Sequence, residues 1–209
     1  MYHGERLNSI SHLLGMIFAL MASGALLTVS LRINTIPALI GFNVFGITMV
    51  LLYTISTIYH SVREPRLKRK LKILDHISIY LFIAGTYTPL MLVSLSQGNG
   101  WLILSAVWGL AVLGIAAELL LSGRVVKICQ VISYLGMGWV CSFDLDNVRA
   151  ALPEEGFFWL LTGGIAYTAG IIFYVLDKLN YLTHAHGIWH FFVLAGSVSH
   201  FICVIGFVR

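Results

Sequence analysis

The stretch HGIWHFFVLAGSVSHFICVIGFV, residues 186–208, is apolar over a length that suits a membrane crossing. A transmembrane helix needs about 20 predominantly apolar residues to cross the hydrocarbon core of a bilayer. The stretch begins with His186 and His190, and an imidazole in such a run is costly unless something binds it. It therefore raises two questions: how many such spans the chain contains, and what the two histidines bind.

The composition of the whole chain favours a membrane protein. Of its 209 residues, 58% are hydrophobic and only 11% are charged, whereas soluble domains usually carry about 25% charged residues. The three cysteines, Cys129, Cys141 and Cys203, lie scattered in apolar runs without a CxxC spacing. That pattern argues against a disulfide framework and against a thiolate metal site.

Seven apolar runs are long enough to span a membrane, and each is separated from the next by a short polar or Gly- and Pro-containing connector. The first run is too long for the apolar core of a signal peptide, which is about 7–15 residues. We therefore predict an all-α membrane protein, a seven-transmembrane-helix bundle that occupies residues 1–209 as a single domain. The predicted spans are His12–Leu31, Pro37–Tyr59, Leu74–Leu95, Trp101–Leu121, Val125–Phe143, Phe157–Leu176 and Gly187–Val208. The predicted connectors include SVREPRLKRKLK (61–72), SQGNG (96–100) and DLDNVRAALPEEG (144–156).

The distribution of Lys and Arg predicts how the bundle is oriented. Cytoplasmic loops of membrane proteins carry an excess of these residues, so we expect the N-terminus in the cytoplasm and the C-terminus outside, in the plasma (inner) membrane. The basic connector is interpreted as a topology signal and a contact for anionic lipids, not as a nucleic-acid site. One side holds Arg6, Arg63, Arg66, Lys68, Arg69, Lys70, Lys72, Arg124, Lys127 and Lys178, and the other holds Arg32, Arg149 and Arg209.

Ionisable side chains converge at the cytoplasmic ends of three predicted spans. His60 ends the second span, and Asp75 lies one turn into the third. His186 and His190 begin the seventh span. Ionisable residues inside a membrane mark functional sites, so these four side chains at one membrane depth form the candidate site.

The spacing of the histidines suits a metal ion. His186 and His190 are four residues apart on one helix face, with Cβ atoms about 5–6 Å apart, and His60 would supply a third imidazole. Three protein ligands with an open fourth position are typical of catalytic zinc, although Fe, Ni or Cu also accept imidazole. Asp75 would hold a water molecule or orient a ligand, and Ser56, four residues before His60, shares its face.

An alternative remains open at this point, because buried histidines also form plain structural hydrogen bonds between helices. Among the other histidines, we expect His76 to have a structural or supporting role, His184 to be solvated and His200 to be a packing residue. His12 and Asn8 border the first span at the same membrane face, and they are secondary candidates for the wall of the pocket.

Several motifs together resemble a known family. They are GERLNSISHLLG, STIYHS, LDHISIYLFIAGTYTPL, GGIAYTAGIIFY and HGIWHFFVLAGSVSHF, in this order along the chain. They resemble the bacterial hemolysin III proteins of the progestin and adipoQ receptor family, which includes the adiponectin receptors.

This resemblance implies a zinc ion near the cytoplasmic face. By the same resemblance His60, His186 and His190 are its ligands, and Ser56 and Asp75 belong to the family's Ser-Asp-His pocket, with Asp75 next to a zinc-bound water.

The superfamily also contains alkaline ceramidases, and this analogy suggests hydrolysis of a lipid amide or ester, with a fatty-acyl substrate or product. Two other functions stay open at this stage. The first is a non-enzymatic sensor of membrane lipid state in which zinc is structural. The second is a pore-forming cytolysin, which we rank lowest because the spans carry no polar stripe that could line a conducting path.

Overall fold

The computed structural model describes residues 4–209, apart from the side chains of residues 124 and 125. Among the described residues, seven helical segments are long and apolar enough to cross a membrane, which confirms the predicted fold class. In chain order the α-helices are α1 (Arg6–Ile33), α2 (Ile36–Ser61), α3 (Pro65–Pro89), α4 (Gly100–Leu120), α5 (Arg124–Gly138), α6 (Leu145–Ala150), α7 (Glu154–Lys178) and α8 (Ala185–Phe207). A π-helical turn (Leu90–Ser94) follows α3, and a 3₁₀ segment (Val140–Asp144) follows α5.

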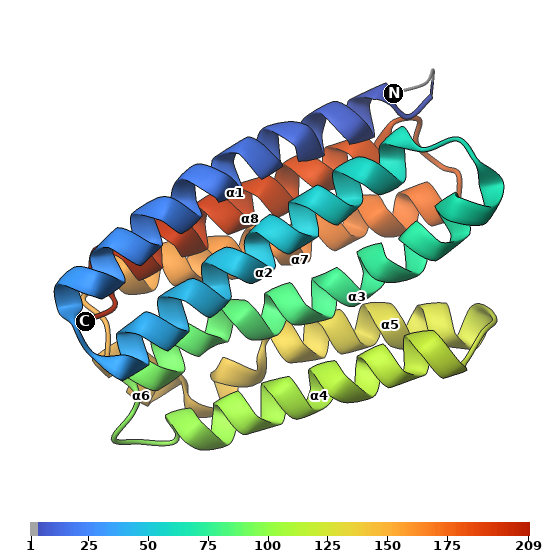
Figure 1. Ribbon diagram of the computed structural model, residues 1–209. Helices are drawn as coiled ribbons and strands as arrows, with labels where there is room; N and C mark the ends of the chain where they lie inside the picture. Colours follow the sequence, from blue (N-terminus) through green and yellow to red (C-terminus); the bar gives the residue numbers. More distant parts are fainter. Residues whose placement is uncertain (1–3) are drawn as a thin grey trace.

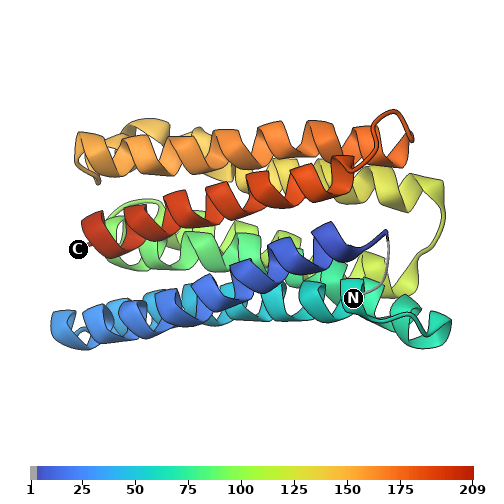
Figure 2. The ribbon, with the colours of Figure 1, turned by 90° about the horizontal axis from the view of Figure 1, so that it is seen from above.

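The helices form an elongated bundle in which the first and last helices are neighbours. α1 lies beside α8 in two perpendicular views (Figures 1 and 2) and also packs against α2, while α7 packs along α8. α4 and α5 form the opposite edge of the bundle (Figure 1). The two termini lie at opposite ends (Figure 1), as an odd number of spans requires. The end of α2 and the beginning of α8 therefore lie at the same end of the bundle as the N-terminus.

The connector predicted at 61–72 is mostly helical, so that part of the prediction was wrong. α3 begins at Pro65, because proline suits the first turn of a helix and the Glu64 carboxylate accepts hydrogen bonds from the backbone N–H groups of Arg66 and Leu67. These hydrogen bonds hold the pKa of Glu64 below its ordinary value. The basic residues after Pro65 thus lie on the first turns of α3. The connector at 144–156 likewise contains the short helix α6.

Small residues allow the helices to approach closely at both ends of the bundle. A Cβ atom on Gly187 in α8 would collide with the Leu7 side chain of α1. A Cβ atom on Gly41 in α2 would lie 2.7 Å from the Cα atom of Pro89. Close approach at glycine is the usual way in which transmembrane helices pack. At Gly187 it brings the beginning of α1 against the beginning of α8.

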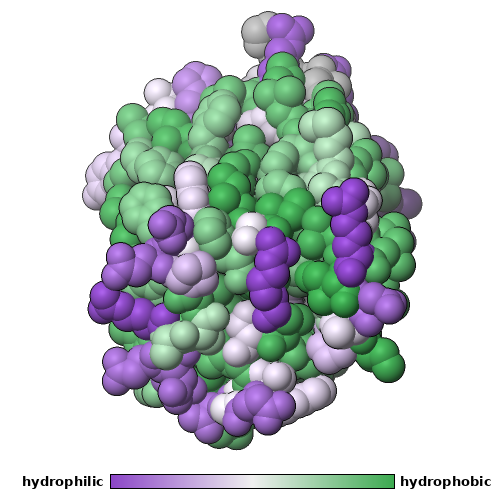
Figure 3. Space-filling view, turned by 90° about the vertical axis from the view of Figure 1, so that its left-hand side faces the viewer, coloured by the Kyte–Doolittle hydropathy of each residue, from purple (hydrophilic) through white to green (hydrophobic). Residues whose placement is uncertain are grey.

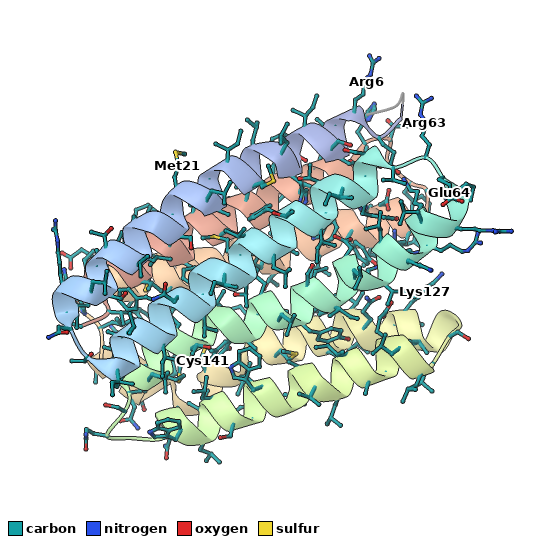
Figure 4. All side chains as sticks on the ribbon, viewed as in Figure 1. Arg6, Met21, Arg63, Glu64, Lys127 and Cys141 are labelled. Atoms are coloured by element: carbon teal, nitrogen blue, oxygen red, sulfur yellow. The ribbon has the colours of Figure 1, made fainter. Side chains whose placement is uncertain are left out.

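Charged side chains gather at the ends of the bundle, and its flanks are apolar. Arg6, Arg63, Glu64 and Lys127 extend from the end that holds the N-terminus, whereas Met21 projects from the flank of α1 (Figure 4). We call this end the basic end. At the opposite end, separate hydrophilic side chains stand among hydrophobic ones (Figure 3). This distribution is that of a protein whose flanks face lipid.

Candidate metal centre

Three histidines meet inside the bundle near its basic end. His60 comes from the last turn of α2, and His186 and His190 come from the first turns of α8. One potential ligand atom from each of the three lies within 4.8 Å of the others. The ring centroids are 5.2 Å apart for His60 and His186, 5.0 Å for His60 and His190, and 4.7 Å for the pair on α8. The structure therefore brings together the three histidines that the sequence singled out.

Two of these imidazoles are oriented by carboxylates. The Nδ1 atom of His60 lies 2.7 Å from an oxygen of Glu5, just before α1, and Nδ1 of His186 lies 3.2 Å from Asp177 in α7. An ionised carboxylate only accepts hydrogen bonds, so each Nδ1 must be the protonated nitrogen. In each ring the Nε2 atom is then left with a free lone pair.

The Glu5 carboxylate is suited to this role because it stays ionised. Burial by itself raises the pKa of Glu5, but hydrogen bonds from His60 and Lys68 outweigh burial and hold the pKa well below its ordinary value. The Lys68 ammonium lies 2.8 Å from the second oxygen of this carboxylate. Glu5 thus links the end of α2 to the beginning of α3.

The third imidazole has the same tautomer for a different reason. The Ser11 hydroxyl oxygen lies 3.0 Å from Nδ1 of His190 and 2.9 Å from the backbone oxygen of Asn8. A serine hydroxyl has one proton, and the carbonyl of Asn8 can only accept it. The Ser11 oxygen therefore accepts a hydrogen bond from Nδ1–H of His190, and Nε2 of His190 also keeps a free lone pair.

Each of the three imidazoles thus carries its proton on Nδ1, and its Nε2 lone pair is free. Three neighbouring nitrogens with free lone pairs are the arrangement that a cation requires. The Nε2 atoms of His60 and His190 are buried and have no hydrogen-bond partner among the described residues. Orienting one ring nitrogen through a carboxylate or other acceptor is typical of metal-binding histidines. In a tetrahedral zinc site two such nitrogens are about 3.4 Å apart, so the three rings would close slightly around an ion. The residues present fit a metal ion.

Asp75 and Ser56 lie beside the three histidines. Both are buried, Asp75 on α3 and Ser56 one turn before His60 on α2. The Ser56 side chain forms a hydrogen bond with the Asp75 carboxylate. Both residues line the same cavity. The structure therefore places both predicted pocket residues at the cavity wall near the metal centre.

We call this cavity the main cavity; it runs beside the metal centre and along the interior of the bundle. It has a volume of about 120 Å³ and is lined mainly by apolar and aromatic side chains. Trp189 and His200, eleven residues apart on α8, both line it, so it extends for about 16 Å along that helix. Its lining is that of a site for an apolar ligand.

A second, smaller cavity leads from the centre toward the basic end. Asp75 lines both cavities, and His186, Lys72 and Lys178 line the smaller one. The two lysines come from α3 and α7, so the wall of the smaller cavity is more polar than that of the main cavity. Asp75 thus lies where the more apolar cavity meets the more polar one.

The other histidines that the structure describes lie in three kinds of environment: the packing of the bundle, its exposed surface and the wall of the main cavity. His76 points to Glu118 of α4, at 2.7 Å, and His184 is exposed. His200 lies 3.2 Å from the backbone oxygen of Leu160. His12, only a secondary candidate from the sequence, lies in the wall of the main cavity.

Sequence reasoning missed the residues that orient the ligands. Glu5, Ser11 and Asp177 were not singled out from the sequence. All three lie at the same end of the bundle as the histidines. The argument from membrane depth that selected Asp75 would have drawn attention to the carboxylates Glu5 and Asp177, but not to Ser11, which is not ionisable.

Changing Glu5 to Gln tests the orienting role of this carboxylate. We expect the affinity for zinc to fall about 10–100-fold, as is typical when an orienting partner of a metal ligand is lost. Titration of purified protein against a chromophoric zinc chelator would measure it. Glu155→Gln, an exposed change near the beginning of α7, is the matched control. Equal affinities in the two variants would contradict the role of Glu5.

Comparison with known proteins places the chain in a family. The model of the haemolysin-III related family matches residues 1–201. The chain is 39% identical to "Hemolysin-3" of Bacillus cereus over 204 residues, which cover 98% of the chain and 91% of that protein. It is 37% identical to the "Hemolysin-3 homolog" of Bacillus subtilis (strain 168) over 201 residues, 96% of the chain and 92% of that protein.

A more distant relative is human. The chain is 25% identical to the "Monocyte to macrophage differentiation factor" of Homo sapiens over 170 residues, which cover 77% of the chain and 67% of that protein. The family predicted from the motifs is confirmed. With seven membrane-spanning helical segments among its described residues, the chain is a multi-pass integral membrane protein that belongs to the haemolysin III-related family.

Proposed function

We propose that this protein is a zinc-dependent hydrolase that cleaves an amide or ester bond of a membrane lipid. The observation that carries the proposal is the set of three imidazoles, each oriented through Nδ1 so that its Nε2 lone pair faces the others. Imidazoles without thiolates suit zinc best among the common metals. Three protein ligands leave a fourth position open for reaction.

The chemistry divides between the ion and Asp75. A zinc ion held there would lower the pKa of a coordinated water to about 7 and polarise a carbonyl group. Asp75 would accept a proton from the attacking water as the water oxygen bonds to the carbonyl carbon. It would return that proton to the leaving nitrogen or oxygen as the C–N or C–O bond breaks. The products are a fatty acid and an amine or alcohol. Ser56, hydrogen-bonded to Asp75, would fix the orientation of the carboxylate.

The two cavities suit the two kinds of reactant. The main cavity is apolar and long enough to accept much of an acyl chain. The smaller cavity reaches Asp75 from the basic end, where Lys72 and Lys178 make its wall polar enough for water. A lipid would thus place its scissile bond between them. By the excess of Lys and Arg, the basic end would face the cytoplasm.

Release of fatty acid by purified protein tests this function. The metal-loaded protein would be offered a long-chain N-acyl sphingosine as the amide and a phosphatidylcholine as the ester, with release followed by mass spectrometry. We expect release from at least one of the two, its loss after treatment with a chelator and its return when zinc is added. No release from either lipid by zinc-loaded protein would contradict the proposal.

The alternative is a regulator in which zinc only holds helices together. One observation favours it: the ligands and the residues that orient them come from α1, α2, α7 and α8 or the segments next to them, so one ion would link four helices. In that case, alanine at the ligand positions would lower the melting temperature, and the wild-type protein would release no fatty acid. The lipid assay therefore separates the two functions.

A further inference from the structure

A fourth imidazole lies beside the three candidate ligands, and no residue that the structure describes forms a hydrogen bond with it. His12 of α1 is 3% exposed, and its ring stands edge-on to that of His190 with 3.8 Å between centroids. The centroid of the His60 ring is 6.2 Å away. Neither ring nitrogen of His12 has a hydrogen-bond partner among the described residues. Buried polar atoms are nearly always paired, so an imidazole with both nitrogens unpaired indicates a missing partner.

The side chains around His12 cannot supply that partner. The ring of Tyr53 packs against it at 5.3 Å, but the Tyr53 hydroxyl lies 2.8 Å from Ser197. The neighbouring Ser11 hydroxyl is bonded to Asn8 and His190. The remaining open direction is the main cavity, which His12 lines together with Ser56 and Asp75. The partner of His12 must therefore come from what occupies this cavity.

His12 is also unsuited to be a fourth ligand. Its ring nitrogens fall outside the group that the atoms of His60, His186 and His190 form. Four imidazoles would fill all positions of a tetrahedral zinc ion and close the site, and the cavity that reaches His12 would then lead to no open position. From the wall of this cavity, an N–H group of His12 would instead be able to contact the carbonyl group of a bound lipid.

We propose that His12 is a catalytic residue that donates an N–H hydrogen bond to the carbonyl oxygen of the scissile bond. Negative charge grows on this oxygen when water attacks, and a donor fixed in a dry site stabilises that charge strongly. His12 and Asp75 would thus act on different atoms, His12 on the carbonyl oxygen and Asp75 on the proton of the attacking water. The site would select lipids whose acyl carbonyl reaches the depth of His12. This inference rests on the proposed hydrolase function.

The test compares His12 with His200, a half-buried histidine that lines the same cavity. Unlike His12, His200 has a hydrogen-bond partner, because its ring nitrogen lies within hydrogen-bonding distance of the Leu160 backbone oxygen. The variants are His12→Leu and His12→Gln, with His200→Leu and His200→Gln as matched controls. Each would be measured for metal content, for the absorption spectrum of bound Co²⁺, for fatty-acid release and for binding of a long-chain acyl hydroxamate.

We expect His12→Leu to keep its metal and its Co²⁺ spectrum while kcat falls about 10²–10³-fold, the usual effect of losing one donor to the developing oxyanion. KM should change little. His12→Gln keeps an N–H donor and should recover most of the rate. Because His200 lines the same cavity, its two variants measure the effect of changing the cavity wall alone, and their kcat should fall less than that of His12→Leu. Hydroxamate binding should weaken at least tenfold in His12→Leu, independently of turnover.

Three outcomes would overturn the inference. A changed Co²⁺ spectrum or lost metal in His12→Leu would make His12 a ligand. Equal losses in the His12 and His200 variants would make it a packing residue. Hydroxamate binding that His12→Leu leaves unchanged would also exclude the hydrogen bond. A further outcome separates the two proposals. If the wild-type protein cleaves no lipid, but binds the hydroxamate more tightly than His12→Leu does, the hydrolase function is wrong, whereas the contact of His12 with a bound carbonyl stands.

Discussion

The His186→Ala/His190→Ala double variant is expected to hold no zinc, whereas the wild-type protein is expected to hold about one ion per chain. The two imidazoles are adjacent on α8 and supply two of the three converging nitrogens, so a single remaining histidine cannot retain the ion. Elemental analysis of freshly purified protein would measure the loss. A ligand that binds only the folded state stabilises it by about 2.7 kcal/mol at 100 times its Kd. A chelator should therefore lower the melting temperature of wild type and leave that of the double variant unchanged.

The matched control is His184→Asn, which changes a histidine two residues before His186. His184 is exposed and has a positive φ of 65°, a conformation that asparagine adopts more readily than most residues. This variant should hold as much zinc as wild type. A wild-type protein that holds no metal even after zinc is offered would reduce the three histidines to contacts between helices. The hydrolase function would then be wrong as well.

The second large effect is expected from Asp75→Asn. Asparagine keeps the size of the side chain but cannot accept the proton of the attacking water, so fatty-acid release should fall about 10²–10⁴-fold, the range that general-base catalysis supplies. Bound zinc should remain near the wild-type level, because Asp75 is outside the three-histidine group. Rate and metal content measured on the same preparation separate loss of catalysis from loss of the ion.

Asp146→Asn is the control for this change. Asp146 is an exposed aspartate in α6 that lines neither of the two cavities at the metal centre. Its variant should release fatty acid at the wild-type rate. Wild-type activity in Asp75→Asn would remove Asp75 from the proposed mechanism while leaving the metal centre intact.

The spans were predictable because hydropathy over about 20 residues dominates the structure of a membrane helix. The beginning of α3 was not predicted, since the basic residues after Pro65 read as a connector. Their helix starts from local features instead, the Glu64 cap and the proline. Long basic side chains at a helix end can extend toward the interface. Charge alone therefore did not mark where α3 begins.

The candidate site was predictable to the extent that membrane depth defines it. His60 and His190 lie at matching depths because α2 ends, and α8 begins, at the same end of the bundle. The orienting contacts depend on more than depth. Whether His12 faces the cavity or the lipid depends on the rotation of α1 about its axis, and α1 has several polar side chains near this end. The approach of α1 to α8 at Gly187 settles that rotation, and it is a property of the packed bundle.

The neighbouring positions of α1 and α8 have a consequence for how the protein is made. The beginning of α1 supplies Ser11, and α8, which leaves the ribosome after the other six spans described, supplies His186 and His190. The complete set of candidate ligands cannot form until the seventh span has been inserted and has packed against the first. A metal ion would then bind only after that step, and a chain cut short after α7 would lack two of the three histidines.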